Sequence, residues 1–227
     1  MSLARLACAA AVSLFLVLGA PAALASYGVA TGAGAPELHV NASGVAEVSW
    51  TAGGARKSFL VPRSGAGHYG SLAGKDVSKP TSLALPLAVT VRETPDHTLW
   101  ALQRVAIAGR PTSLDLARWQ GPATKLTLVD DGTHLTGGAT FHGRPVAGYS
   151  STLTGKRARI YVYLECFGCP GARNAWTLML GVPPKADGSF AVALRPSWRG
   201  KRYRATVFGP NVGGELAPDA RVTLDAA

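Results

Sequence analysis

The chain has 227 residues, with 23 Lys and Arg against 13 Asp and Glu, which gives a formal net charge of +10. Apolar residues make up 47% of it and include five tryptophans, a composition that excludes an intrinsically disordered protein. This length is sufficient for one large all-β domain or for two smaller sandwiches. Composition therefore indicates a folded, basic protein and leaves the number of domains open.

The first 25 residues have the pattern of a secretory signal peptide. Arg5 precedes an apolar run from Leu6 to Leu18, and Ala23-Leu24-Ala25 supplies the small residues that a signal peptidase requires. This run is shorter than the roughly 20 apolar residues of a membrane-spanning helix, so we predict cleavage rather than retention as an anchor. The mature chain is then expected to begin at Ser26 and to be secreted, with attachment to the cell surface left open.

After this leader, apolar residues alternate with polar ones in short runs bounded by Gly, Pro and Asp, which is typical of β-strands. The first run is at 45–50, and Gly53-Gly54 is expected to turn the chain into a second strand at 57–61. Further strands are predicted, in chain order, at 83–91, 99–107, 126–129, 134–141, 159–165, 176–180, 190–194, 203–208 and 221–224. Pro86 favours an edge or bulge position for the strand at 83–91, because proline has no N–H to donate to a neighbouring strand.

Short strands at this spacing predict an all-β fold of one or two antiparallel, Ig-like β-sandwich lobes. Proline and glycine interrupt the pattern between residues 109 and 124, which indicates a boundary. We therefore predict a signal peptide at 1–25, an N-terminal β-rich lobe at 26–118 and a C-terminal sandwich lobe at 119–227. A single continuous sandwich is the alternative.

Two resemblances accompany this pattern. The segments TPDHTLWALQ (94–103), WQGP (119–122), GRPVAG (143–148) and RYRATVFGP (202–210) resemble a family of uncharacterised secreted proteins of actinobacteria. This resemblance spans more than half of the chain and implies export and a β-rich fold, without an activity. Trp176, DGSF (187–190) and KRYRA (201–205) are also similar to the Ig-like and prealbumin-like modules of bacterial surface proteins.

Positive charge is concentrated between residues 144 and 204. This segment has eleven Lys and Arg residues against two acidic ones, Glu165 and Asp187. Such a segment attracts polyanions, whether envelope polymers, anionic lipid or nucleic acid, although strand alternation could also place solvated cations on an outer face. The residues that we expect to bind a polyanion, including two aromatic side chains as stacking partners, are Arg157, Arg159, Tyr161, Trp198, Arg199, Lys201 and Arg202.

Cys166 and Cys169 are the two cysteines that remain after removal of the leader, which contains Cys8. In an oxidising compartment we expect them to form a disulfide that fixes a short loop at the end of a strand. A thiol-disulfide oxidoreductase is the alternative, but the residues after Cys169 predict a loop and a strand rather than the helix that would stabilise a reactive thiolate. No second cysteine pair is present to complete a zinc site.

Other catalytic patterns are weak. The five histidines are scattered singly, and His134 and His142 lie too far apart on one extended strand to share a metal. Asp130, Asp131 and Glu165 are candidate carboxylates for glycoside hydrolysis, but turn capping and pairing with arginines explain them equally well. The sequence contains none of the common nucleophile, zinc or nucleotide-binding motifs, and we predict no cofactor, no metal site and no catalytic residue.

The leading hypothesis is a secreted, non-enzymatic β-sandwich protein that binds an anionic cell-envelope polymer or another extracellular polyanion through the basic segment. Two alternatives stay open. One is a secreted enzyme, either a hydrolase or the thiol-disulfide oxidoreductase above, whose site is assembled from residues distant in the sequence. The other is a structural or protein-interaction module.

Overall fold

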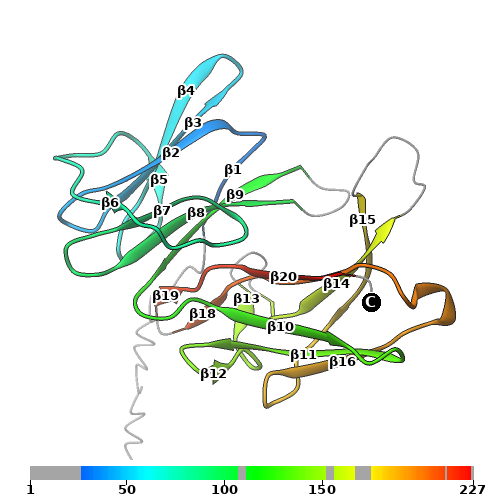
Figure 1. Ribbon diagram of the computed structural model, residues 1–227. Coiled ribbons are helices and arrows are strands. Elements are labelled where there is room, and N and C mark those ends of the chain that lie inside the picture. The colour runs from blue at the N-terminus through cyan, green and yellow to red at the C-terminus, as the bar shows by residue number, and fades with distance from the viewer. Residues whose placement is uncertain (1–26, 107–110, 152–155, 167–174, 213, 226–227) are drawn as a thin grey trace, which may run out of the picture.

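The computed structural model describes residues 27–106, 111–151, 156–166, 175–212 and 214–225, and within these ranges the protein is built from β-strands in several antiparallel sheets (Figure 1). The predicted all-β, antiparallel sandwich fold is therefore confirmed. One short 3-10 turn, Pro196–Trp198, is the only helical element among the described residues. No helix in this part of the chain has the length and apolar character needed to cross a membrane.

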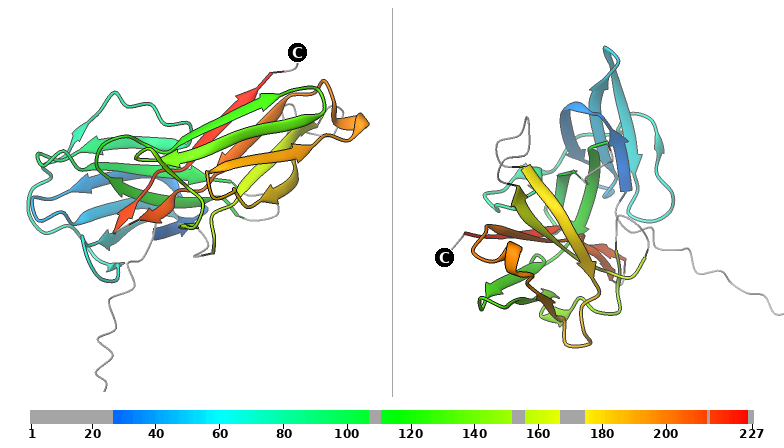
Figure 2. Two further views of the ribbon diagram at one scale, coloured as in Figure 1. Left: turned by 90° about the horizontal axis from the view of Figure 1, so that it is seen from below. Right: turned by 90° about the vertical axis from the view of Figure 1, so that its right-hand side faces the viewer.

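Two sheets form the N-terminal part of the fold (Figures 1 and 2). The first has the order β2-β3-β4-β5, with strands β2 (Gly34–Val40), β3 (Ala46–Ala52), β4 (Ala55–Val61) and β5 (His68–Tyr69). The second has the order β13-β18-β19-β9-β8-β7-β6, with β1 also paired to β9. Its strands are β1 (Tyr27–Thr31), β6 (Lys79–Pro80), β7 (Ala88–Glu93), β8 (Leu99–Val105), β9 (Ser113–Trp119), β13 (Ser150–Ser151), β18 (Pro210–Val212) and β19 (Glu215–Leu216).

The C-terminal part is a sandwich of two four-stranded sheets. In one, β11 (His134–Phe141) pairs with β10 (Lys125–Asp130), β12 (Arg144–Pro145) and β16 (Ser189–Ala193). The other has the order β15-β14-β17-β20, with strands β14 (Ile160–Cys166), β15 (Ala175–Val182), β17 (Tyr203–Val207) and β20 (Ala220–Leu224). Strand β19 pairs with β9, and β18 pairs with β19, so the large sheet combines strands from the N-terminal and C-terminal parts of the chain. The predicted boundary after residue 118 stays a prediction.

The turn between β3 and β4 shows how the sequence dictates local structure. Gly53 and Gly54 have φ angles of 60° and 78°, and two successive positive φ angles are what a tight two-residue hairpin requires. Trp50 then lies opposite Lys57 across the two strands. The hairpin predicted from alternation and the glycine pair is therefore confirmed.

The strand predicted at 83–91 is wrong in its first half. Strand β7 begins only at Ala88, and the residues around Pro86 form a turn in which the Ala88 amide donates to the Leu85 carbonyl at 3.1 Å. Proline cannot donate to a neighbouring strand, so the chain joins the sheet after it rather than through it. Leu87 is buried and Leu85 packs against the C-terminal core from this loop, whereas Leu83 is exposed.

Between the prolines and glycines at 109–111 and 121–122, residues 113–119 form β9 in the middle of the large sheet, a strand that the sequence pattern did not predict. Leu114 and Leu116 face the first sheet and pack in a core with Trp50 and Trp100. Trp119 on the opposite face belongs to the core of the C-terminal sandwich. A sheet covered on both faces does not show the clean alternation of a half-exposed strand, so β9 carries no simple period of two.

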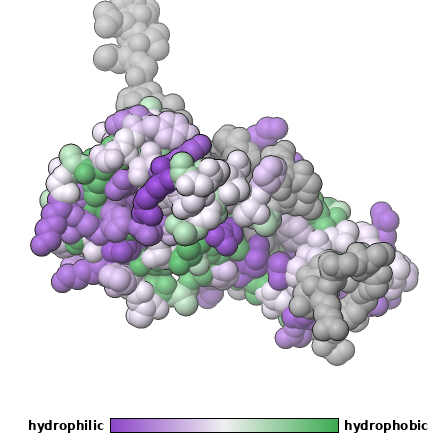
Figure 3. Space-filling view, turned by 90° about the horizontal axis from the view of Figure 1, so that it is seen from above, coloured by the Kyte–Doolittle hydropathy of each residue, from purple (hydrophilic) through white to green (hydrophobic). Residues whose placement is uncertain are grey.

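The protein thus has two hydrophobic cores on either side of the large sheet. The N-terminal core fills the space between this sheet and β2–β4, and the C-terminal core lies between the two sheets of the sandwich and extends to β8 and β9. Hydrophilic residues cover most of the face seen in Figure 3, with smaller apolar areas between them. The packing leaves the outer face of the β15-β14-β17-β20 sheet to carry polar and charged groups.

Candidate functional site

The outer face of the β15-β14-β17-β20 sheet gathers arginine and aromatic side chains. Along β14, Ile160 and Val162 are fully buried in the sandwich core, so Tyr161, Tyr163 and Glu165 take the opposite face. Pairing then sets their neighbours: Tyr163 lies opposite Arg204 on β17, and Glu165 lies opposite Trp176 on β15.

A stacked cation–aromatic pair is at the centre of this face. The Arg204 guanidinium lies 3.9 Å from the centroid of the Trp176 ring, and the Arg202 guanidinium lies 5.8 Å from it. On the neighbouring strand, the Arg221 Nε donates to the Thr206 hydroxyl at 3.4 Å. We call the group of Tyr161, Tyr163, Trp176, Arg202, Arg204 and Arg221 the arginine–aromatic face.

Charge on this face is only partly neutralised. Arg202 is paired with the buried Glu165 at 3.0 Å and with the exposed Asp225 at 2.8 Å. Arg204 has no ion-pair partner within 4.0 Å among the described residues, and its Nε is buried without a hydrogen-bond acceptor there. Burial, followed by repulsion from Arg221 and Arg202, lowers the pKa of Arg204 to about 10, so its guanidinium is still charged at neutral pH.

The residues predicted to bind a polyanion are divided between this face and other parts of the sandwich. Tyr161 and Arg202 belong to the face, and the exposed Arg159 adjoins it, donating to the Gly181 carbonyl at 3.0 Å. The Tyr161 ring packs 5.2 Å from the Phe208 ring, so one side of it is already covered.

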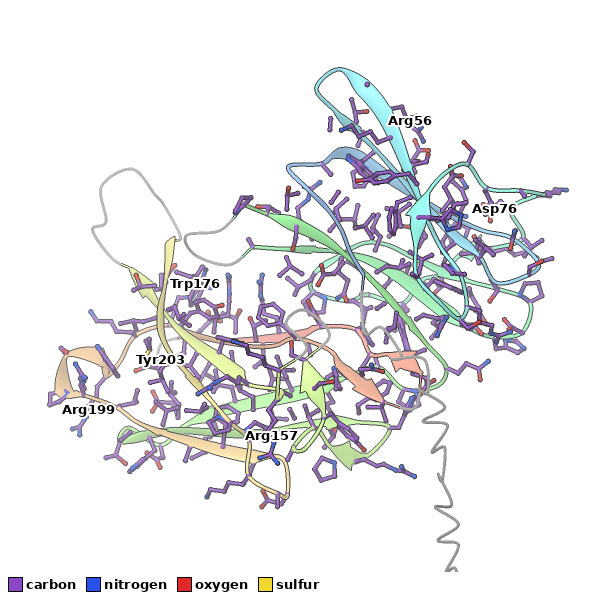
Figure 4. The ribbon with its side chains drawn as sticks, turned by 180° about the vertical axis from the view of Figure 1, so that it is seen from behind. Arg56, Asp76, Arg157, Trp176, Arg199 and Tyr203 are labelled. Atoms are coloured by element: carbon purple, nitrogen blue, oxygen red, sulfur yellow. The ribbon has the colours of Figure 1, made fainter. Side chains whose placement is uncertain are left out.

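The other predicted binding residues lie elsewhere. Trp198 ends the 3-10 turn, packs against the sandwich core, and has the Arg195 guanidinium 4.7 Å above its ring. Arg199 is exposed and Lys201 is half-buried in the segment that leads to β17. Arg157 pairs with Ser150 in an isolated bridge, and Figure 4 shows it at a different place on the sandwich from Arg199. The seven residues therefore do not form one cluster.

Four residues of the face were absent from the predicted set: Tyr163, Trp176, Arg204 and Arg221. Arg204 follows Arg202 by two positions, so strand alternation puts the two on the same face and could have identified it. Trp176 and Arg221 reach the face only through the pairing of β15 and β20 with their neighbours, and that order is not encoded in the local pattern.

The predicted disulfide between Cys166 and Cys169 involves a residue outside the described part of the chain, so it stays a prediction. Glu165, the residue before this pair, is the ion-pair partner of Arg202. Pairing with an arginine, which the sequence analysis gave as the alternative to a catalytic role, therefore accounts for Glu165.

Among the described residues, the His39–Asp76 pair does not extend to a hydrolytic triad. The His39 Nδ1 lies 2.8 Å from Asp76 Oδ2, but its Nε2 faces Glu37 at 3.6 Å, where a triad would place a nucleophilic hydroxyl. His142 pairs with Glu215 at 2.8 Å, and His134 lies beside Asp131. Within the described ranges, no three His, Cys, Asp or Glu side chains come together in a way that could hold a metal ion.

A pair of buried carboxyl groups lies where the large sheet meets the C-terminal sandwich. Asp115 on β9 and Asp219 before β20 are each 2% exposed. The Gln103 amide, on β8 beside Asp115, accepts from the Asp219 backbone N–H at 2.9 Å and donates to its carbonyl at 3.3 Å. Burial, with the second carboxyl group as a further cause, raises the pKa of Asp115 to about 8, and burial raises that of Asp219 to about 7.

Comparisons of the chain with protein-family models, with curated proteins and with solved structures found no match. Its function is therefore argued from its own residues.

Proposed function

We propose that the protein is a secreted, non-enzymatic β-sandwich protein that binds an anionic polymer of the cell envelope or of the extracellular space. The signal-peptide pattern of residues 1–25 supports export, and the positive charge of the chain supports attraction of polyanions. The arginine–aromatic face is the proposed contact surface. An enzymatic function has no comparable cluster in its favour among the described residues.

The stacking of Arg204 on Trp176 is the observation that carries this proposal. An indole ring holds the guanidinium by cation–π attraction without neutralising it. An arginine without a carboxylate partner keeps its planar N–H groups for phosphate or carboxylate oxygens, which it binds in a bidentate manner. Repulsion among Arg202, Arg204 and Arg221 is relieved when a polymer places negative charge between them.

A polymer is a better ligand for this face than a single small anion. Arg204 on β17 and Arg221 on the neighbouring strand β20 place cations side by side across the sheet. The exposed Arg159 adds a further charge beside Tyr161. Neutralising several charges on one chain releases several counterions, so affinity increases with each contact and decreases steeply with salt. The half-buried rings of Tyr161 and Trp176 can support sugar or base rings between the anionic groups, whereas the Tyr163 ring is buried.

The test is retention of the mature protein on immobilised teichoic acid, heparin and DNA, with the salt concentration for release recorded. The double variant Arg204→Gln/Arg221→Gln removes two cations from the face, and Arg144→Gln/Lys185→Gln removes two exposed cations from outside it. If the face binds, the first variant is released at lower salt, and its slope of log affinity against log salt is smaller by about 1 to 2. The second variant keeps the wild-type slope.

Trp176→Leu and the triple reversal Arg199→Glu/Lys201→Glu/Arg202→Glu extend this test. The first removes the ring beneath Arg204 and is expected to weaken retention without changing net charge. The second asks whether the segment before β17 also contributes. Equal loss of retention in the face and control variants would refute the proposal, because general positive charge would then explain the binding.

A further inference from the structure

A pocket lies at the end of the N-terminal part, remote in the sequence from the arginine–aromatic face. Its walls come from the turn after β2 (Asn41, Ala42 and Gly44), from Arg63 after β4, and from Val77 before β6. The β7–β8 turn contributes Thr94, Pro95, Asp96 and Thr98, and Trp100 on β8 forms the floor. The segment TPDHTLW, which the sequence analysis singled out, therefore builds one side of this pocket.

The pocket is held open by a fixed framework. Asn41 Oδ1 accepts from the backbone amides of Ser43 and Val45 at 3.1 and 3.0 Å, and its Nδ2 donates to the Ala73 carbonyl at 2.8 Å. Across the opening, Asp96 Oδ1 accepts from the Thr94 hydroxyl at 2.6 Å. These bonds fix the backbone of both turns, so the pocket exists before any ligand enters.

Strain in the β7–β8 turn fits the same interpretation. His97 has a φ of 60°, an unfavourable value for a residue with a side chain, and its backbone N–H donates to the Thr94 carbonyl at 2.9 Å. This conformation turns the chain so that Asp96 and Thr98 both line the pocket. The turn therefore keeps a costly geometry that places polar groups at the opening.

Size and charge limit what the pocket can hold. Its volume of about 370 Å³ is near the lower end of the range for small-molecule sites, which suits one ring rather than a polymer segment. Its two charged residues, Arg63 and Asp96, pair with each other at 3.0 Å, so they cancel. An anionic ligand gains no net attraction there, in contrast to the arginine–aromatic face.

The polar and apolar groups of the lining are complementary to a hydroxylated ring. Arg63 and Asp96 are both exposed and offer a donor beside an acceptor, the arrangement that two adjacent hydroxyl groups satisfy. Ala42, Val77 and Pro95 supply apolar contacts for the C–H groups of such a ring. The indole nitrogen of Trp100, at the floor, is buried without an acceptor among the described residues.

From this combination we infer that the pocket binds one neutral saccharide unit, oriented by the Arg63–Asp96 pair. This site is separate from the proposed polyanion surface and does not depend on it. The Trp100 floor, only 1% exposed, is a rigid wall and reports on occupancy.

The experiment is titration of the ¹⁵N-labelled mature protein with glucose, galactose, mannose and N-acetylglucosamine, followed by the indole N–H signal of Trp100. We expect a saturable shift with at least one of them. Ala42→Phe fills the pocket from an exposed position and should weaken binding about tenfold or more. Ala186→Phe, at an exposed position in the turn before β16, is the matched control and should bind like the wild type.

Arg63→Met tests orientation by the ion pair and should also weaken binding, while the fold is checked by the remaining amide signals. Binding by Ala42→Phe at wild-type affinity, or loss of binding in both phenylalanine variants, would overturn the proposal. So would the absence of a saturable shift with all four sugars, or tighter binding of glucuronate than of glucose. Sugar binding should not change with salt or in Arg204→Gln/Arg221→Gln, so failure here is distinguishable from failure of the polyanion proposal.

Discussion

Replacing Asp115 by Asn is expected to flatten the decrease of stability with rising pH. The Asp115 side chain is 2% exposed, and neither of its carboxylate oxygens has a hydrogen-bond partner among the described residues. Burial, and then the nearby Asp219, raises the pKa of Asp115 to about 8. An acid with a higher pKa in the folded state takes up a proton on folding, so its ionisation lowers stability not at all below the unfolded pKa of about 4 and progressively more up to about pH 8.

The magnitude follows from the size of this shift. A rise of about four pKa units corresponds to about 5 kcal/mol of unfolding free energy lost between the two pKa values. This is an upper bound, because relaxation and water entry reduce the cost of a buried charge. Asn at this position has no proton to lose, so the variant should gain up to about 3 kcal/mol over the wild type between about pH 5 and pH 8.

The assay is urea denaturation of both proteins at about pH 5 and pH 8. The difference in unfolding free energy between variant and wild type is measured at each pH, and its change between the two reports the titration. Asp219 is coupled to Asp115, so its own titration changes in the variant and the difference reports the pair of carboxyl groups. Asp187→Asn is the control, because this carboxyl group is in an exposed turn, where the Ser189 hydroxyl lowers its pKa. A wild type and an Asp115→Asn variant that lose stability in parallel from pH 5 to pH 8 would refute the argument.

Two further predictions concern packing and acid stability. Gly209→Ala should destabilise the protein by several kcal/mol in urea denaturation, because the added Cβ would lie 1.8 Å from the Ala217 carbonyl oxygen. Gly28→Ala should change it little, since the nearest atom to its Cβ is 3.8 Å away, and equal effects of the two substitutions would contradict this. Burial alone would raise the pKa of Asp76, but hydrogen bonds from Ser78, His39 and the Val40 amide hold it well below its usual range. The stability that these hydrogen bonds contribute is present above about pH 4 and is lost as the pH decreases. Asp76→Asn should therefore remove about 2 kcal/mol of unfolding free energy at neutral pH and leave a flatter acid-unfolding profile. A profile as steep as that of the wild type would argue against this role.

Local patterns were sufficient to predict strands where one face meets a core and the other meets solvent. The pair β10–β11 and strand β14 form where alternation predicted them, and the hairpin of β3 and β4 forms around the predicted glycine turn. The same reasoning failed at β9, because Leu114 and Asp115 are both buried, one in each direction. A strand that separates two cores has no solvent face, and its sequence therefore lacks the signal on which the prediction depends.

Strand β9 also shows why the buried acids could not be anticipated. Asp115 and Asp219 are 104 positions apart, and their proximity depends on the chain returning to the large sheet through β18 and β19 before β20 begins. Neither residue belongs to a motif. An acidic residue is expected to be exposed to solvent. Tertiary packing instead buries both Asp115 and Asp219 where the large sheet meets the C-terminal sandwich.

For the binding face, the limit of prediction was the order of the strands. Alternation along β14 puts Tyr161 on the face opposite the fully buried Ile160 and Val162, and alternation along β17 relates Arg202 to Arg204. Arg221, in contrast, lies in a segment whose overall charge is negative, and it joins the face because β20 pairs with β17 and brings it opposite Thr206. Net charge along the chain is therefore a poor guide to this surface, because the cluster depends on four strands, β15, β14, β17 and β20, meeting in register. Removing Arg221 should weaken polyanion retention more than removing Arg157, which lies closer in sequence to the other predicted residues.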